Sequence, residues 1–261
     1  MPRIYLSADT IFYAAPASIG TGDGSSAANA MGDEQSALDY LQTNFDKNGY
    51  TLRMQLLAGT YSRGIQMTGP IIGGDKPGGS PLIIQGDPAN PDAYVFNTPG
   101  VNTFSFIQGA VATIVGFTIS ASGASCLYAT QGGIIEYGGI RFGTANSHIR
   151  ADIDGFLVCT STDEMVQGAN EHYSINKGYI GVVPGVIMKC DVQYGIGFQD
   201  FFSIEKGGQL DLPVNLLTWQ GNFSGSRGIV KNGGRADCGG AVNSIPGSSA
   251  AIVADSYSQI M

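Results

Sequence analysis

The residues most suited to chemistry are acidic side chains near the middle of the chain. Asp152 and Asp154 are two positions apart, so on a β-strand both would point to one face with their Cβ atoms about 7 Å apart. Glycoside hydrolysis needs two carboxyl groups about 5–9.5 Å apart, one protonated and one ionised. The pair therefore admits a sugar-cleaving site, but a solvated strand face or corner explains it more simply because such pairs are common.

The other ionisable residues give weaker signals. His148 and His172 are 24 positions apart, and we expect them to stack on adjacent repeats as packing residues rather than as a site. Four further acidic residues are isolated in the sequence: Asp191, Asp200, Glu205 and Asp211. The Asn-Thr-Asp, Asp-Asp and Gly-His-Gly motifs of polygalacturonases are absent, and no Lys or Arg base stands beside a calcium-binding acidic cluster, as a lyase would need. We therefore predict no catalytic residue, no metal and no cofactor.

Glycan binding has looser requirements, namely exposed aromatic faces beside carboxylates or amides in a shallow groove. Six aromatic residues are candidates: Tyr128, Tyr137, Tyr173, Tyr179, Tyr194 and Trp219. Because side chains alternate along a strand, about half of them should point inward. Packing in the core or in a subunit interface is thus the competing explanation, and we assign no binding residue.

The cysteines are widely spaced and form no Cys-x-x-Cys pair: Cys126, Cys159, Cys190 and Cys238. This pattern favours buried free thiols, in a protein made in a reducing cytosol, over a disulfide framework or a zinc site.

These residues lie in or near a repeat that extends from Leu82 to Met188. Five glycines recur at intervals of 23 residues: Gly86, Gly109, Gly132, Gly155 and Gly178. The residues ten positions after them form an unbroken apolar column: Phe96, Ile119, Phe142, Met165 and Met188. The columns eight and two positions after them have one exception each, Asp163 and Pro88. A fixed period of this length indicates a stack of similar supersecondary units.

The composition of each unit indicates β-structure. Short alternating segments such as Phe104–Ile107 and Phe117–Ile119 are bounded by glycine rather than by helix caps. We predict a β-solenoid whose coils of about 23 residues pair in parallel, with glycine at corners where the backbone turns sharply or takes a positive φ. Since Asp163 and Glu164 interrupt the apolar pattern, we expect their coil to open into a loop there.

The N-terminal segment should close one end of this stack. Arg3–Leu6 is predicted as a short strand and Ala14–Met31 as an ordered loop. Asp33 can cap a helix with an apolar stripe, which Asn48-Gly49 would end. The stripe contains Ala37, Leu38, Leu41 and Phe45. Such a helix would cover the apolar, unpaired end of the strands.

Beyond the helix, Tyr50–Leu56 alternates and is predicted as the first strand of the first coil, with a corner at Ala58–Tyr61. A glycine- and proline-rich loop between Ile65 and Pro81 should project from the stack. We therefore divide the chain into an N-terminal strand, loop and capping helix (1–50), the repeat (51–238) and an extended C-terminal tail along a neighbour or partner (239–261).

Composition excludes some classes of function. The 261 residues include 39 glycines and only 13% charged residues, and the net charge is −8. This balance argues against an electrostatic interaction with nucleic acid or an anionic membrane. The first residues lack a secretory-signal pattern, and no apolar run approaches the roughly 18 residues of a membrane span. Low charge fits strands covered by their own core and by partner subunits.

Three segments carry a family resemblance. They are Lys47–Tyr50 followed by Ala58–Tyr61, Leu127–Gly133 leading into Ile134–Phe142, and an Asn-Gly-Gly turn followed by Ile245–Ser248. In these segments the chain resembles the right-handed parallel β-helix proteins of tailed bacteriophages and prophages, which are tail or head fibres and spikes. The resemblance implies an all-β, right-handed, single-stranded parallel β-helix of about seven to eight coils with an N-terminal capping α-helix.

The resemblance also implies a function. We expect a structural, homotrimeric virion protein, assembled in the bacterial cytoplasm, with tail, baseplate or capsid proteins as partners and contact to host surface glycans. Some relatives cleave surface polysaccharide, and the same fold class includes pectate lyases. The alternative is therefore a polysaccharide-degrading lyase or glycoside hydrolase, although no carboxylate motif in the sequence favours it.

Overall fold

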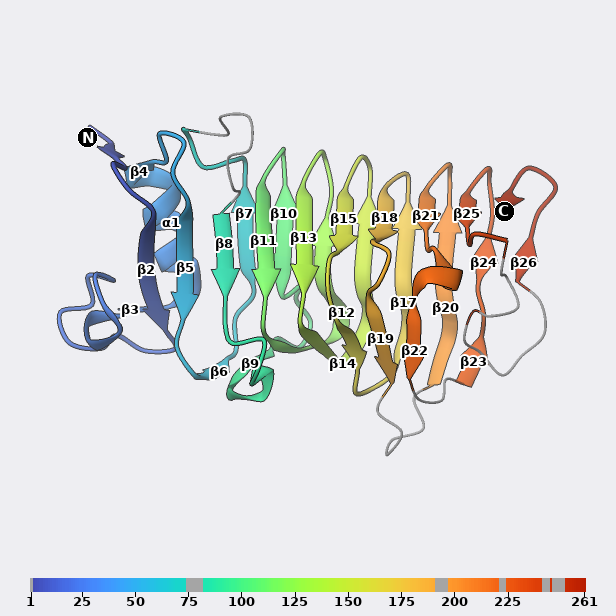
Figure 1. The fold of residues 1–261 in the computed structure, drawn as a ribbon, viewed down its shortest axis with the longest axis horizontal. Helices are drawn as coiled ribbons and strands as arrows, with labels where there is room; N and C mark the ends of the chain where they lie inside the picture. The colour runs from blue at the N-terminus through green and yellow to red at the C-terminus, as the bar shows by residue number, and fades with distance from the viewer. Residues whose placement is uncertain (1, 74–81, 191–196, 221–223, 241–244, 246–251) are drawn as a thin grey trace.

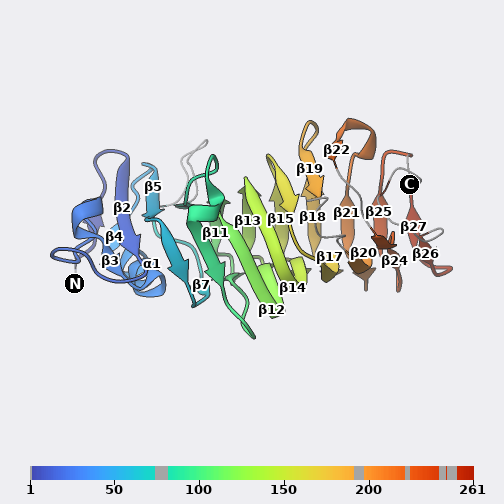
Figure 2. The same ribbon diagram turned by 90° about the horizontal axis from the view of Figure 1, so that it is seen from below.

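Two long sheets of parallel strands make up most of the protein, seen in a computed structural model (Figure 1). The structure describes residues 2–73, 82–190, 197–220, 224–240, 245 and 252–261. Within these residues the strands lie across the long axis of the ribbon, with the N-terminal strands at one end and the C-terminal strands at the other (Figures 1 and 2). The predicted all-β fold with parallel strands is confirmed.

The first sheet has 11 strands. In spatial order they are β27 (Gln259–Ile260), β25 (Arg235–Asp237), β21 (Gln209–Asp211), β18 (Tyr179–Val182), β15 (Phe156–Cys159), β13 (Ile134–Gly138), β11 (Val111–Val115), β8 (Leu82–Gln85), β5 (Leu52–Leu56), β2 (Thr10–Ala15) and β3 (Met31–Gly32).

The second sheet has 14 strands. One path contains β22 (Thr218–Gln220), β19 (Ile187–Cys190), β16 (Asp163–Met165), β14 (Ile140–Asp152), β17 (Ala169–Asn176), β20 (Gly197–Glu205), β24 (Ile229–Val230) and β26 (Val253–Ala254). The others are β12 (Thr118–Ala129), which pairs with β14, β9 (Tyr94–Asn97) and β10 (Phe104–Ile107); β6 (Gly59–Tyr61) on β9; β7 (Ile65–Thr68) on β10; and β23 (Ser224–Ser226) on β20.

The remaining elements are short. They are a two-stranded pair of β1 (Ile4–Tyr5) and β4 (Phe45–Asp46), the helix α1 (Glu34–Asn44), and the 3-10 helices η1 (Ala27–Asn29), η2 (Pro91–Ala93) and η3 (Val214–Leu216).

From β5 onward the chain alternates between the two sheets, and paired strands come from residues about one period apart. Val111 is opposite Ile134, 23 residues later, and Ile134 is opposite Phe156, 22 residues later. The period lengthens afterwards, because Tyr179 is opposite Gln209. One apolar core fills the space between the sheets.

The predicted apolar column is confirmed for four of its five members. Phe96, Ile119, Phe142 and Met165 are opposite one another on successive strands, and none is exposed. Met188 is also buried, but its partner is Asp163, two positions away from the predicted one. The register shifts where the period begins to lengthen.

The glycine period covers more than one kind of corner. Gly132 has a φ of 77° and follows Gln131, whose φ is 52°. Gly155 has no such φ. A Cβ added to it would meet the carbonyl oxygen of Ala129 at 2.1 Å, so its position requires close approach of two backbones. Because one round is a residue shorter, equal spacing places these glycines at adjacent structural positions.

The N-terminal segment agrees in part with the prediction. The Asp33 side chain accepts hydrogen bonds from the N–H groups of Gln35 (3.0 Å) and Ser36 (3.3 Å), as expected of the cap. The helix ends at Asn44 rather than at Asn48-Gly49, because Phe45 adopts extended backbone and packs on Phe12.

Three other segments differ from their predicted form. The predicted loop Ala14–Met31 begins with the last residues of β2, which pairs with β5. Ile65–Thr68, predicted as the start of a projecting loop, is β7, and residues 74–81 lie outside the described part. Beyond residue 238, β26 pairs with β24 and β27 with β25, so strands from this segment extend both sheets.

Candidate functional site

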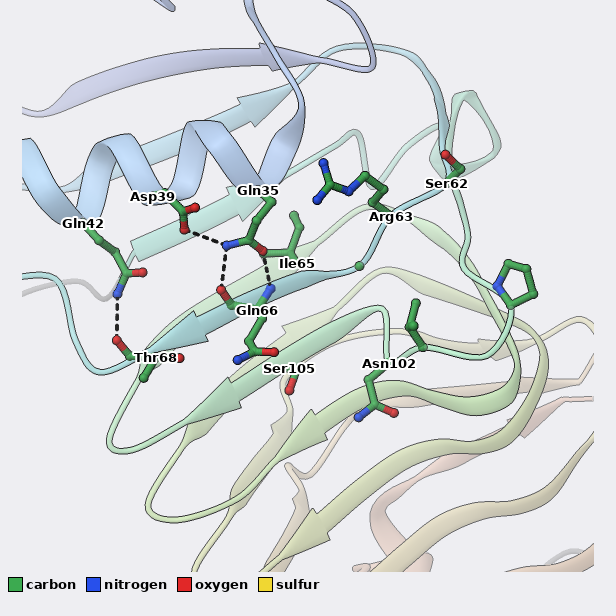
Figure 3. Close-up of a pocket in the computed structure, with 13 residues that line it drawn as sticks. Gln35, Asp39, Gln42, Ser62, Arg63, Ile65, Gln66, Thr68, Asn102 and Ser105 are labelled. Carbon is green, nitrogen blue, oxygen red and sulfur yellow. Dashed lines mark hydrogen bonds between the residues drawn. The ribbon is translucent and has the colours of Figure 1, made fainter.

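The largest groove lies beside α1. It has a volume of about 760 Å³ and lies between the helix, β7, β10 and the segment 99–102 (Figure 3). Its lining residues are Gln35, Asp39, Gln42, Ser62–Gln66, Thr68, Pro99, Val101, Asn102 and Ser105. Gly64 allows the close crossing of two segments here, since an added Cβ would meet the carbonyl oxygen of Asn102 at 2.2 Å.

One wall of the groove forms because side-chain amides, rather than another strand, cover the edge of β7. The N–H of Gln66 donates to Gln35 Oε1 (2.6 Å), and Gln35 Nε2 donates back to the Gln66 carbonyl (2.9 Å). Gln42 Nε2 donates to the carbonyls of Thr68 (3.2 Å) and Gly69 (3.0 Å). Residues seven apart lie on the same face of a helix, so the two glutamines follow the strand edge.

Other polar groups remain for a ligand. The Gln66 carboxamide is exposed and directly opposite Ser105 (Figure 3). Asn102 Oδ1 accepts from the Ser125 N–H (2.9 Å), which leaves its amino group as a donor. The exposed Asp39 is the only carboxylate of the lining, and Arg63 pairs with Asp33. Such a groove suits a neutral, hydroxyl-rich ligand, whereas one carboxylate does not make the pair that glycoside hydrolysis needs.

The predicted pair Asp152 and Asp154 does not share a strand face. Asp152 is the last residue of β14 and is only 8% exposed, whereas the exposed Asp154 lies in the following turn with a φ of 61°. Asp152 accepts from Tyr128 Oη (3.2 Å) and pairs with Arg150 (2.8 Å). The expected geometry is wrong because the strand ends between the two residues.

The predicted loop at Asp163 and Glu164 is also wrong. The two residues belong to β16 and lie opposite Ile140 and Arg141 of β14. Glu164 pairs with Arg141 (3.2 Å), while Asp163 is fully buried in the core. Polar partners inside the core hold this carboxyl group, which a hydrophobicity pattern does not reveal.

The histidines contact each other on adjacent strands, as their spacing predicted. His148 and His172 are both fully buried, with Nδ1 atoms 2.9 Å apart. Burial and the neighbouring His172 lower the pKa of His148 well below its ordinary value. These rings are closed to a ligand.

A carboxyl pair that the sequence analysis missed lies on β17 and β20. Glu171 is directly opposite Asp200, and neighbouring strands are about 4.8 Å apart. Asp200 is 5% exposed, and Ser147 Oγ donates to Glu171 (3.0 Å). Burial raises the pKa of Glu171, Ser147 opposes this, and Asp200 raises it further. The two positions are 29 apart in the sequence, so a period of 23 does not align them.

The other acidic residues interpreted as isolated give no second cluster. Asp211 accepts a hydrogen bond from Tyr179 Oη (3.4 Å). Glu205 ends β20, and Asp191 lies outside the described residues. No group of three or more metal-binding side chains occurs in the described part of the chain.

The predicted aromatic candidates divide between core and surface. Tyr137 and Tyr173 are fully buried. Tyr128 is half-buried with the Arg150 guanidinium 5.8 Å from its ring centre, and Tyr179 stacks on a neighbouring aromatic ring. The side chains of the other two lie outside the described residues: Tyr194 and Trp219. None of the six lines the groove beside α1.

Three of the four cysteines are buried free thiols: Cys126, Cys159 and Cys238. The Cys190 side chain lies outside the described residues.

Comparison with known proteins gives no identity. No family model, curated protein or solved structure matches this chain. Within the described residues, no helix has both the length and the apolar character needed to cross a membrane.

Proposed function

We propose that this chain is a structural component of the virion of a tailed phage, in a tail or head fibre or spike. It forms a right-handed parallel β-helix, assembles as a homotrimer, attaches to tail, baseplate or capsid proteins, and contacts host surface glycans. The observation that carries the proposal is the continuous alternation between two parallel sheets around one core, with no separate catalytic cleft described. Such a stack suits a stiff rod.

The location is tested on intact particles. Antibody-gold labelling against this protein, viewed by electron microscopy, should mark a fibre, spike or head position on phage particles from a lysogenic or infected host. Particles that carry no label, while the free protein is present in the same lysate, would refute the virion assignment.

An outward apolar column supports the trimer. Val111, Ile134, Phe156 and Tyr179 are opposite one another on the 11-stranded sheet, and the last two rings stack at 4.6 Å with 9° between their planes. Phe156 is 37% exposed. Contact with a second copy would remove this apolar surface from water.

Sedimentation tests the trimer. We expect wild-type protein to have three times the mass of one chain and Phe156→Glu to sediment mainly as a single chain. Gln209→Glu, next in the same outward column, is the matched control and should leave the mass unchanged. A wild-type mass equal to one chain would contradict the trimer.

The groove beside α1 supports glycan contact. We expect binding to some members of an array of immobilised bacterial surface polysaccharides, with at least a tenfold loss in the double variant Gln66→Ala/Asn102→Ala. Thr43→Ala, on the exposed side of the same helix, is the control. Equal binding by all three proteins would place glycan contact elsewhere.

One observation favours the alternative, a polysaccharide-degrading enzyme. Glu171 with its raised pKa and the opposite Asp200 have the proximity that a retaining glycosidase needs, about 5–5.5 Å between carboxyl groups. Reducing ends or unsaturated products released from surface polysaccharide would support this activity, provided that Glu171→Gln and Asp200→Asn abolish them. The variant pair Asp152→Asn/Asp154→Asn tests the carboxylates that the sequence indicated.

A further inference from the structure

A chain of hydrogen bonds runs through the core at the middle of the stack. His148 Nε2 lies 2.8 Å from the Gly143 carbonyl oxygen, and His148 Nδ1 lies 2.9 Å from His172 Nδ1. His172 Nε2 lies 3.2 Å from Asp163 Oδ2. The three side chains are fully buried, so their hydrogen bonds must be satisfied within the protein.

The atoms in these contacts fix where the hydrogens lie. A carbonyl oxygen only accepts, so His148 Nε2 carries a hydrogen, and in a neutral ring His148 Nδ1 is then an acceptor. The hydrogen between the two rings must therefore belong to His172 Nδ1. His172 Nε2 and Asp163 Oδ2 would then both be acceptors, facing each other at 3.2 Å, unless a further proton lies between them.

We propose that the Asp163–His172 pair stores this additional proton in the folded protein, and that the proton makes the stability of the middle of the stack depend on pH. The proton either converts His172 to an imidazolium facing a carboxylate or neutralises Asp163 as an acid. In both forms the pair is neutral overall, which burial favours.

The surrounding groups do not supply the proton or a compensating charge. Tyr137 Oη lies 3.2 Å from Asp163 Oδ2, and burial raises the pKa values of Tyr137, Tyr173 and Cys159, so these three remain neutral. Asp163 Oδ1 is buried without a partner. The only ion pair to Asp163 among the described residues is the one with His172.

The remaining contacts are aromatic rings. Phe142 stacks on His148 at 5.2 Å, Phe201 stacks on His172 at 5.2 Å, and Phe198 lies edge-on to His148 at 5.8 Å. These rings exclude water, and no solvent molecule can take the place of the missing donor.

Asp163→Asn gives a sharp test because an asparagine N–H can donate to His172 Nε2 without the stored proton. Unfolded wild type and variant bind the same number of protons between pH 5 and 8, since an unfolded Asp titrates near pH 3.9. The folded wild type holds one proton more than the folded variant. The ratio of the two unfolding constants should therefore change about tenfold per pH unit, with the wild type losing stability relative to the variant as pH rises.

The measurement is the unfolding constant from denaturant titrations at pH 5, 6, 7 and 8. Asp154→Asn, in an exposed turn, is the control, and its ratio to wild type should be constant with pH. A ratio for Asp163→Asn that is also constant with pH would overturn the proposal.

A second measurement needs no variant. The chain has only two histidines, so nitrogen-15 NMR of histidine-labelled protein reports on these rings alone. We expect His148 in the neutral form protonated at Nε2, with a hydrogen on His172 Nδ1, from pH 5.5 to 8. Two rings that titrate together near pH 6.5, as solvent-exposed histidines do, would overturn the proposal.

Discussion

The N-terminal edge of the 14-stranded sheet and the middle of the stack satisfy the same backbone groups by different means. In the middle, β14 pairs on one side with β12 and on the other with β16 and β17. At the edge, β7 has β10 on one side only, and Gln35 and Gln42 of α1 occupy the other. A sheet edge therefore needs partners for its peptide groups, and a helix can supply them through its side chains.

The comparison also predicts where substitutions are costly. In the middle the side chains are fully buried, so a lost contact leaves a cavity or an unsatisfied group. At the edge Gln66 is exposed, and water can replace a lost amide. Substitutions should thus cost more free energy of unfolding in the middle than at the edge.

The largest expected effect is in the middle. Phe142→Ala should lower the free energy of unfolding by about 3–5 kcal/mol, because it removes a fully buried ring from the apolar column. Denaturant titration measures this. Phe156→Ala, at a position 37% exposed, is the control and should cost less than half as much; equal costs would remove the distinction between core and outward columns.

The glycine period gives the second test. Gly155→Ala should cost about 1–3 kcal/mol because its Cβ would collide with a backbone oxygen. Gly109→Ala meets no atom within 4 Å but has a φ of 75°, so it should cost only about 1 kcal/mol. The reverse order, measured by denaturant titration, would mean that the two glycines have the same role.

At the edge, the double variant Gln35→Ala/Gln42→Ala should cost about 1–2 kcal/mol, since each hydrogen bond contributes about 0.5–1.5 kcal/mol net. Uncovering β7 should also increase self-association, which sedimentation at increasing concentration detects. Thr43→Ala should change neither quantity. Loss of stability as large as that of Phe142→Ala would show that the edge is no more tolerant than the middle.

The smallest effect concerns the start of α1. Asp33→Ala removes the cap and should cost about 1 kcal/mol, visible as a lower Tm. Asp33→Asn retains a capping oxygen and loses only the exposed ion pair with Arg63, so it should cost under about 0.5 kcal/mol. If the two variants are equally destabilised, the ion pair rather than the cap is responsible.

The regular part of the stack could be predicted because its signals are local and repeated. Alternation identified β5, and the apolar column aligned Phe96 through Met165. The period did not distinguish Gly132 from Gly155, since a one-residue deletion leaves their spacing at 23. It also lost register at Met188, where the rounds become longer.

The site could be predicted only in part, because its partners come from different elements. Hydrogen bonds between α1 and the edge of β7 leave no pattern in the sequence, so the groove was missed. A polar residue at an apolar position, such as Asp163, indicates a loop when its buried partner is unknown. Glu171 and Asp200 were missed because residues inserted between them hide their alignment.

The direction of the strands has a mechanical consequence. The strands lie across the long axis (Figure 1), so the hydrogen bonds that join them run along it. A pull along the rod loads one layer of bonds at a time and peels strands from a free end, whereas a sideways load is shared by many layers. Under tension the first resistance at the N-terminal end comes from α1 and its two glutamines, which work there as a latch.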